Sequence, residues 1–274
     1  MSSDFDLKIF VCVKQVPGVS EVRIDPNTNT LVREGVLSII NPNDRNAIEL
    51  ALVLKETHGS EVIILSMGPP QAEEALREAL AMGADKGFLL TDKAFAGADT
   101  LATSYTLALG IKKILKESDP EEKYLVICGA QAIDGDTGQV PPELAEELGI
   151  PQITYVQNIE LNKTKIIVER AFRAVEIVII ETQLPALISV LKDINKPRYP
   201  TMAGIMKAHD GKGVKYLDAN LLNADKSKIG LNGSMTEVQK IFIPERKGNH
   251  IIFKGTIEET VQKLCQSLKD DKIF

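Results

Sequence analysis

The residues best suited to chemistry lie in one short loop that separates an apolar run from an amphipathic segment. The loop contains three glycines, Gly129, Gly135 and Gly138, and two acids, Asp134 and Asp136. The segment after it opens with two prolines, which have no N–H to donate and are accepted only near a helix start. The amides just before them therefore lack helical partners. Free amides at a helix N-terminus favour an anion, and glycines let a ligand approach the backbone, so the pattern favours a phosphate.

Two interpretations of this loop stay open on the residues alone. In the first, the amides of residues 137–140 bind the diphosphate of a nucleotide. Asp134 and Asp136, which would repel a phosphate, then turn toward ribose hydroxyls or accept hydrogen bonds from loop amides. In the second, the loop only caps the following helix and both acids form turns. The chain has no G-x-G-x-x-G after its first strand and no Walker lysine motif, so the usual nucleotide fingerprints do not decide between them.

The elements around the loop predict an α/β protein. Four short apolar runs, at residues 8–14, 61–68, 86–90 and 123–129, alternate with amphipathic segments that are typical of helices. Strands that are almost wholly apolar have both faces covered, so we expect a doubly wound, mostly parallel sheet. The expected helices are residues 43–59, 69–84, 99–116 and 140–149.

Four segments reach the edge of this sheet where a ligand is expected. In open parallel sheets, ligands bind beyond the carboxyl ends of the strands. Three of the segments follow predicted strands, at residues 12–15, 66–68 and 129–140. The fourth opens a helix whose expected N-cap is Asn43 or Asp44.

The pattern further along the chain changes to consecutive strands. Residues 152–172 read as two strands about a polar turn at Asn162 and Lys163, and residues 175–190 add more strand. We expect an antiparallel extension of the same core, because no linker rich in Gly, Ser or Pro intervenes. A hairpin is also expected at residues 21–34, around an Asp-Pro-Asn turn.

The last part of the chain has little apolar surface of its own. Beyond about residue 209 it is polar until a final amphipathic helix, expected at residues 256–268. Such a segment does not easily hold a core, so we expect it to wrap another surface.

Composition excludes several classes of function. The chain has 274 residues, a net charge of -6 and a pI near 5.3, which argue against nucleic acid or an anionic membrane as the main partner. No apolar run approaches the roughly 20 residues that a bilayer span needs. Cys12, Cys128 and Cys265 are widely spaced and suit a reducing compartment, so we expect a cytoplasmic protein. The three histidines have no ligand spacing, so we expect no metal site.

Five collinear motifs resemble the β subunit of electron-transfer flavoproteins. They are "CVKQVPG", "NPNDRNAIELAL", "ALAMGADKG", "AIDGDTGQVPPELAEELGIPQ" and "KPRYPTMAGIMKA", and the likeness runs from about residue 8 to residue 208. The resemblance implies a fold like that of the adenine nucleotide alpha hydrolases and a tight heterodimer with a flavin-binding α subunit. It implies a nucleotide/FAD-binding α/β domain at residues 1–209 and a C-terminal arm at residues 210–274 that wraps the α subunit.

The resemblance also implies which residues form the sites. No catalytic residue is expected, because the cofactor carries the chemistry and the protein tunes it. The implied partner-docking residues are Arg198, Tyr199 and Met202. The implied cofactor-binding residues are Cys12, Asn41, Pro42, Asn43, Asp44, Met67, Gly129, Ala130, Gln131, Ala132, Ile133, Asp134, Gly135, Asp136, Thr137, Gly138, Gln139 and Val140.

The family that the chain resembles has two branches. In one, the β subunit holds structural AMP and the protein ferries electrons from an acyl-CoA dehydrogenase. In the other it holds a second FAD, accepts hydride from NADH and bifurcates the electrons between ferredoxin and a flavin-dependent dehydrogenase. The motif "KQVPG", the expected hairpin "IDPNTNTLVREG" and the uninterrupted "DGDTGQV" resemble the second branch, which we favour. Ala171 stands where the family commonly has an acid, which puts a contact with the mobile α domain in doubt.

Overall fold

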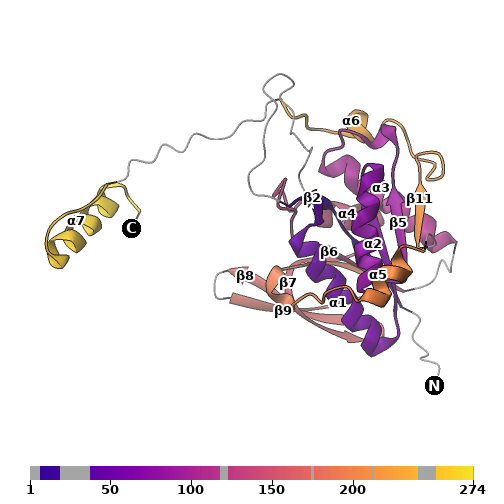
Figure 1. Cartoon of the computed structure of the whole chain (residues 1–274), viewed down its shortest axis with the longest axis horizontal. Coiled ribbons are helices and arrows are strands. Elements are labelled where there is room, and N and C mark those ends of the chain that lie inside the picture. Colours follow the sequence, from indigo (N-terminus) through magenta and orange to yellow (C-terminus); the bar gives the residue numbers. More distant parts are fainter. Residues whose placement is uncertain are drawn as a thin grey trace. The chain divides into compact units, whose positions relative to one another are not determined.

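The computed structural model describes residues 7–18, 38–117, 123–173, 176–210, 213–239 and 251–273 (Figure 1). The chain divides into two compact units, residues 1–239 and 240–274. The hairpin predicted at residues 21–34 lies outside the described residues. Within the described part, no helix is both long enough and apolar enough to span a bilayer.

The first unit is built on a large sheet that is mostly parallel. Among the described residues it has nine strands, in the order β11-β5-β4-β1-β6-β10-β7-β8-β9. A separate antiparallel pair is formed by β2 (Gln15–Pro17) and β3 (Ser38–Ile40). The strands of the large sheet are β1 (Lys8–Cys12), β4 (Glu61–Met67), β5 (Lys86–Leu90), β6 (Tyr124–Gly129), β7 (Gln152–Asn162), β8 (Lys165–Arg173), β9 (Glu176–Gln183), β10 (Ala186–Val190) and β11 (Val214–Leu217).

Helices cover both faces of the sheet, as the apolar strands predict. On one face, α1 and α2 pack over Ile9 and Val11 of β1, and on the other, α3 and α4 pack over Phe10. This arrangement confirms the predicted doubly wound α/β class. The helices are α1 (Pro42–His58), α2 (Glu73–Met82), α3 (Thr100–Lys116), α4 (Val140–Leu148), α5 (Met202–Ala208) and α6 (Gly230–Gly233), with 3₁₀ turns η1 (Pro70–Ala72), η2 (Lys93–Phe95) and η3 (Lys192–Ile194).

The antiparallel extension is shorter than the sequence indicates. β8 pairs antiparallel with β7 and with β9, and the turn lies between Asn162 and Lys165, as predicted. The next strand, β10, instead returns to the centre and pairs parallel with both β6 and β7. Every residue of β10 is buried, which is the pattern of a strand covered on both faces.

Helix α1 begins slightly earlier than predicted. Pro42 occupies its first turn and Asn41 its N-cap position, where the Asn41 side chain makes no capping hydrogen bond. The expected caps, Asn43 and Asp44, therefore lie inside the first turn. The C-terminal end agrees with the prediction, because Gly59 adopts the left-handed conformation at φ 76°.

The first compact unit continues beyond residue 209. β11 pairs parallel with β5 at the edge of the sheet, and α5 packs against α2. The predicted role of residues 210–274 as an arm stays a prediction. In the second unit, α7 (Ile257–Asp270) forms the expected amphipathic helix, with a capping box between Thr256 and Glu259.

Candidate functional site

The candidate site lies at the carboxyl ends of β1 and β6, where the chain connections run to opposite sides of the sheet. Cys12 ends β1 and Gly129 ends β6, the strand beside it. From β1 the chain builds β4 and β5 on one side of the sheet, and later builds β6 and β10 on the other. This divergence is the position at which doubly wound sheets bind ligands. Met67, at the end of β4, lies on the far side of β1 from the β6 loop.

Asn41 joins the start of α1 to the glycine loop. Its side chain is fully buried. Its Nδ2 donates to the main-chain oxygen of Gln131 at 3.0 Å, and its Oδ1 accepts from the main-chain nitrogen of Ile133 at 3.1 Å. The Asn43 side chain donates to the same Gln131 oxygen at 2.9 Å. Two of the four segments predicted to meet at the rim are therefore in direct contact.

Asp44 is the central acceptor of the rim. Its Oδ1 accepts from Nδ2 of Asn41 at 2.9 Å, its Oδ2 accepts from the main-chain nitrogen of Lys14 at 2.8 Å, and the amide of Gly129 also donates to it. Burial raises the pKa of this carboxyl to about 7, against the three hydrogen bonds, which lower it. The carboxyl thus ties together the ends of β1 and β6 and the start of α1.

Gly129 is required by the closeness of this contact. A Cβ placed on Gly129 would lie 2.2 Å from Oδ1 of Asp44 and 2.8 Å from Cβ of Asn43. No side chain is accommodated at that distance, so α1 can approach β6 only because residue 129 is glycine.

The predicted loop residues form a gradient of exposure from the sheet outward. Gly129 and Ala130 are buried, as are Cys12, Asn41 and Asp44 of the neighbouring segments, while Asn43 and Met67 are half-buried and Pro42 is exposed. Half-buried positions of the loop are Gln131, Ala132, Gly138 and Val140, and exposed ones are Ile133, Asp134, Gly135, Asp136, Thr137 and Gln139.

The loop ends in a run of uncommitted amides. Within the described residues, the main-chain nitrogens of Thr137, Gly138, Gln139 and Val140 donate to no protein acceptor, whereas that of Asp136 donates to Ala132 at 2.8 Å. Asp136 and Gly138 adopt left-handed backbone at φ 55° and φ 63°. Alternating conformations of this kind turn successive N–H groups toward one side and form an anion-binding concavity.

The side chains of the two acids in the loop interact with neighbouring side chains. Oδ1 of Asp134 pairs with Nζ of Lys14 at 2.7 Å, and the Asp136 carboxylate accepts from the side chain of Gln131. Among the described residues, neither carboxylate accepts from a main-chain amide of the loop. The loop therefore gains a cation from the β1 connection, which its own residues do not supply, and the amides of residues 137–140 stay uncommitted.

The first turn of α4 is held by α3. Oγ1 of Thr100 donates to Oε1 of Glu143 at 3.1 Å and lies 3.3 Å from Oε1 of Gln139, and Oγ of Ser104 lies 3.3 Å from Oε2 of Glu143. Burial raises the pKa of Glu143, these hydroxyls lower it, and the nearby charge of Asp99 raises it further. The end of the loop is thereby fixed to a second helix.

Two cysteines stand side by side beneath the rim. Cys12 and Cys128 are paired in register across β1 and β6, and both are buried. The contact with Cys12, together with burial, raises the pKa of the Cys128 thiol well above its ordinary range. Both are buried and behave as small apolar side chains, as the sequence predicts. On β4, Oγ of Ser66 is buried and has no partner among the described residues.

Sequence reasoning missed Tyr155. It lies in β7 with a left-handed backbone at φ 58°, beside an irregular step in the pairing of β7 with β10. Its phenol oxygen is 3.6 Å from the point where a Cβ of Gly138 would lie, and the Arg170 guanidinium stands 6.0 Å from its ring centroid. Such backbone is rare for a bulky residue and is concentrated at functional sites. The sequence around it reads as an ordinary strand and gives no signal.

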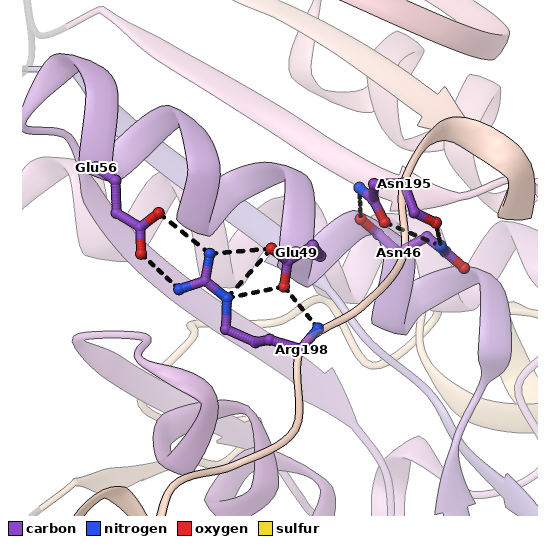
Figure 2. Close-up of polar contacts among 5 residues, drawn as sticks. All are labelled: Asn46, Glu49, Glu56, Asn195 and Arg198. Atoms are coloured by element: carbon purple, nitrogen blue, oxygen red, sulfur yellow. Dashed lines mark hydrogen bonds and ion pairs between the residues drawn. The ribbon is translucent and has the colours of Figure 1, made fainter.

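The three predicted docking residues lie away from this rim. Tyr199 and Met202 are 81% and 75% exposed, whereas the Arg198 guanidinium turns inward onto Glu49 and Glu56 of α1 (Figure 2). The structure therefore separates Arg198 from the other two residues of the set.

The residues of the rim fit a phosphorylated nucleotide. The uncommitted amides of residues 137–140 supply anion donors, and the space around Gly135 is open, with nothing within 4 Å of an added Cβ. Within the described ranges, no three His, Cys, Asp or Glu side chains gather in a way that holds a metal ion. The uncommitted amides and the open space beside them are features that can bind and orient such a ligand.

Comparisons with known proteins agree on one family. A family model described as electron transfer flavoprotein domain matches residues 28–219. The electron transfer flavoprotein subunit beta of Thermoanaerobacterium thermosaccharolyticum is 51% identical, over 98% of this chain and 100% of its own length. The subunit of the same name in Clostridium acetobutylicum is 49% identical, over 97% and 99%. The caffeyl-CoA reductase-Etf complex subunit CarD of Acetobacterium woodii is 47% identical, over 98% and 100%.

Proposed function

Because this chain belongs to the electron transfer flavoprotein β subunit family, we propose that it is the β subunit of an electron-bifurcating heterodimer. In this proposal, the complex with the α subunit takes two electrons from NADH as hydride and releases NAD⁺. One electron passes through the α-subunit FAD to a flavin-dependent dehydrogenase, and the other reduces ferredoxin. The chain acts only within this complex, and the proposed location is the cytoplasm, which the three free thiols support.

The observation that carries the proposal is the run of uncommitted amides at residues 137–140. In the proposal these amides bind the diphosphate of FAD, and the glycines of the loop let it reach the backbone. Lys14, whose side chain is half exposed, supplies a positive charge beside the same loop. A bound flavin supplies the ability to accept a hydride and to give up electrons singly. The chain contributes binding and orientation.

Two exposed apolar surfaces and the name of one relative support the proposed protein partners. The Acetobacterium woodii relative is named as a subunit of a caffeyl-CoA reductase complex, which supports a dehydrogenase acting on an acyl-CoA-type substrate as partner here. The exposed Tyr199 and Met202 are the proposed contacts with it. On α7, Ile257, Val261 and Leu264 recur at helical spacing and are 82%, 52% and 46% exposed, which supports a partner for this helix, proposed to be the α subunit.

The cofactor content of the coexpressed αβ complex tests the proposal. After purification and denaturation, the released FAD and AMP are separated and counted per heterodimer. Two FAD per heterodimer, together with ferredoxin reduction that requires both NADH and the dehydrogenase, are the expected results. One FAD and one AMP would overturn the proposal and assign the chain to the branch that only ferries electrons.

A further inference from the structure

The segment that leads into α5 is fastened to α1 by a fork of ion pairs (Figure 2). Nε and Nη2 of Arg198 each lie 2.9 Å from a different carboxylate oxygen of Glu49, and Nη1 lies 2.5 Å from Glu56. The main-chain nitrogen of Arg198 also donates to Glu49 at 2.9 Å. The Glu49 side chain is 9% exposed, so this pair is shielded from solvent screening far more than a surface pair.

A second contact fixes the same segment three residues earlier. Nδ2 of Asn46 donates to the main-chain oxygen of Asn195 at 2.9 Å, and Nδ2 of Asn195 donates back to the main-chain oxygen of Asn46 at 3.0 Å. Both asparagines appear beside the Arg198 fork in Figure 2. The entry to α5 is thus held at two positions on one helix.

The helix α5 is also held at its middle and at its end. A Cβ on Gly204 would lie 2.2 Å from the main-chain oxygen of Ala81, so α5 lies directly on α2 there. At the last residue of α5, the Arg77 guanidinium donates to the main-chain oxygen of Ala208. Polar contacts and close packing therefore fix the inner side of α5 along its whole length.

The outer side of the same segment is apolar and exposed. Tyr199, Met202 and Met206 are 81%, 75% and 73% exposed, and the two methionines stand one helical turn apart. Methionine adapts to irregular apolar surfaces, and a segment that is already ordered loses less entropy when it binds.

We propose that Arg198 is a positioning residue, which holds Met202 and its neighbours in the orientation that the partner dehydrogenase binds. The proposal rests on the docking role of Met202 given under Proposed function. It reassigns Arg198 from direct contact to support, because its guanidinium is committed to Glu49 and Glu56. Asn195 and Asn46 share this supporting role.

Hydrogen exchange of the αβ complex tests the support without any partner. In Arg198→Gln, the amides of α5 are expected to exchange roughly tenfold faster, because the entry to the helix loses its fork. Lys113→Gln is the matched control, since Lys113 pairs with Glu117 at 3.4 Å at the end of α3, a helix that packs on the opposite face of the sheet from α1 and α2. Arg198→Lys keeps the positive charge but not the forked contact, so its α5 amides are expected to exchange at an intermediate rate. This variant carries the test if Arg198→Gln folds poorly. Unchanged α5 exchange in both Arg198 variants would overturn the proposal.

Docking kinetics test the consequence for the partner. The probe is an acyl-CoA dehydrogenase reduced by its acyl-CoA, with flavin bleaching of the αβ complex as the readout. Arg198→Gln is expected to raise the half-saturating dehydrogenase concentration about tenfold and to leave the saturated rate unchanged. A purely structural role would lower the melting temperature without this shift and would overturn the positioning claim.

A double-mutant cycle separates this inference from the proposed function. If Arg198 acts through Met202, the losses from Arg198→Gln and Met202→Ala are not additive, whereas two independent contacts give additive losses and contradict the inference. Should Met202→Ala alone bind the dehydrogenase as the unmodified complex does, the proposed docking role fails, while the α5 exchange result still decides whether Arg198 orders the helix.

Discussion

Asp44 and Lys14 are joined across the rim of the sheet by a hydrogen bond of 2.8 Å, from the main-chain nitrogen of Lys14 to Oδ2 of Asp44. Lys14 lies just beyond β1 and Asp44 lies in the first turn of α1, so this bond fixes the helix to the strand end. The same carboxyl is buried and has a pKa of about 7. The rim of the site therefore contains a group that titrates near neutral pH.

The stability of the complex is predicted to depend on the ionisation of Asp44. Its pKa rises from 3.8 in the unfolded chain to about 7 in the folded one. The folded state thus binds a proton that the unfolded state has lost, and the stabilisation is full below pH 4 and is lost as the pH rises through 7. At about 1.4 kcal/mol per pH unit, the loss is roughly 4 kcal/mol.

Melting temperatures of the αβ complex between about pH 5 and pH 8 measure this effect. Asp44→Asn is neutral at every pH, so the melting temperature of the unmodified complex is expected to fall relative to that of the Asp44→Asn complex as the pH rises. Other titrating groups contribute equally to both proteins and cancel in the difference. Parallel curves would show that Asp44 does not change its protonation in this range.

Replacing Gly129 with alanine is predicted to disrupt the rim. The new Cβ would lie 2.2 Å from Oδ1 of Asp44, so the start of α1 must move, at a cost of roughly 1–3 kcal/mol. Melting temperature and bound cofactor per complex are both expected to fall. Gly135→Ala is the matched control, because nothing lies within 4 Å of its new Cβ. Equal losses in the two variants would refute the assignment of Gly129 as a close-approach position.

A bulky residue at position 138 is predicted to exclude the β-subunit ligand. Gly138 adopts φ 63°, and a Cβ there would lie 3.4 Å from the main-chain oxygen of Ala130 and 3.6 Å from the Tyr155 hydroxyl, so valine would fill the space beside the loop. The Gly138→Val complex is expected to lose the β-subunit cofactor and to keep the α-subunit FAD. Gly149→Val imposes the same backbone strain at φ 71° in open space, at the far end of α4, and is expected to keep both. Retention of both cofactors by Gly138→Val would mean that the diphosphate binds elsewhere.

Tyr155 is predicted to contact the ligand through its hydroxyl. This hydroxyl has no hydrogen-bond partner among the described residues and faces Gly138. Tyr155→Phe keeps the ring beneath the Arg170 guanidinium, so the melting temperature of the cofactor-free complex is expected to stay the same. Cofactor affinity, measured by titrating that complex, is expected to fall about fivefold, the effect of roughly 1 kcal/mol for a lost hydrogen bond. An unchanged affinity would remove Tyr155 from the site.

The sheet and the uncommitted amides of the loop were predictable because both depend on local patterns. Buried parallel strands are continuous apolar runs, and Gly59 marks the end of α1 through its left-handed backbone. The amides before Pro141 lack helical partners for the same local reason, and the structure leaves them uncommitted. These features need no knowledge of which strands become neighbours.

The features that were not predictable depend on contacts distant in sequence. Arg198 is one positive charge among many until the fold brings Glu49 against it. Tyr155 takes a left-handed backbone because of the irregular pairing of β7 with β10, and its own sequence reads as plain strand. Asn41 stands at a capping position, yet its side chain forms hydrogen bonds with the main chain of Gln131 and Ile133.

The place of β10 sets the order in which the molecule can be assembled during synthesis. Among the described residues, β6 and β7 do not pair with one another, and β10 (Ala186–Val190) lies between them in the sheet. Before residues 186–190 have been synthesised, β7, β8 and β9 form a meander. The edge of β7 that later pairs with β10 then has unpaired main-chain N–H and C=O groups. Nascent chains that stall before residue 186 therefore expose an unpaired strand edge that is prone to aggregation. We expect chaperones and proteases to recognise such chains.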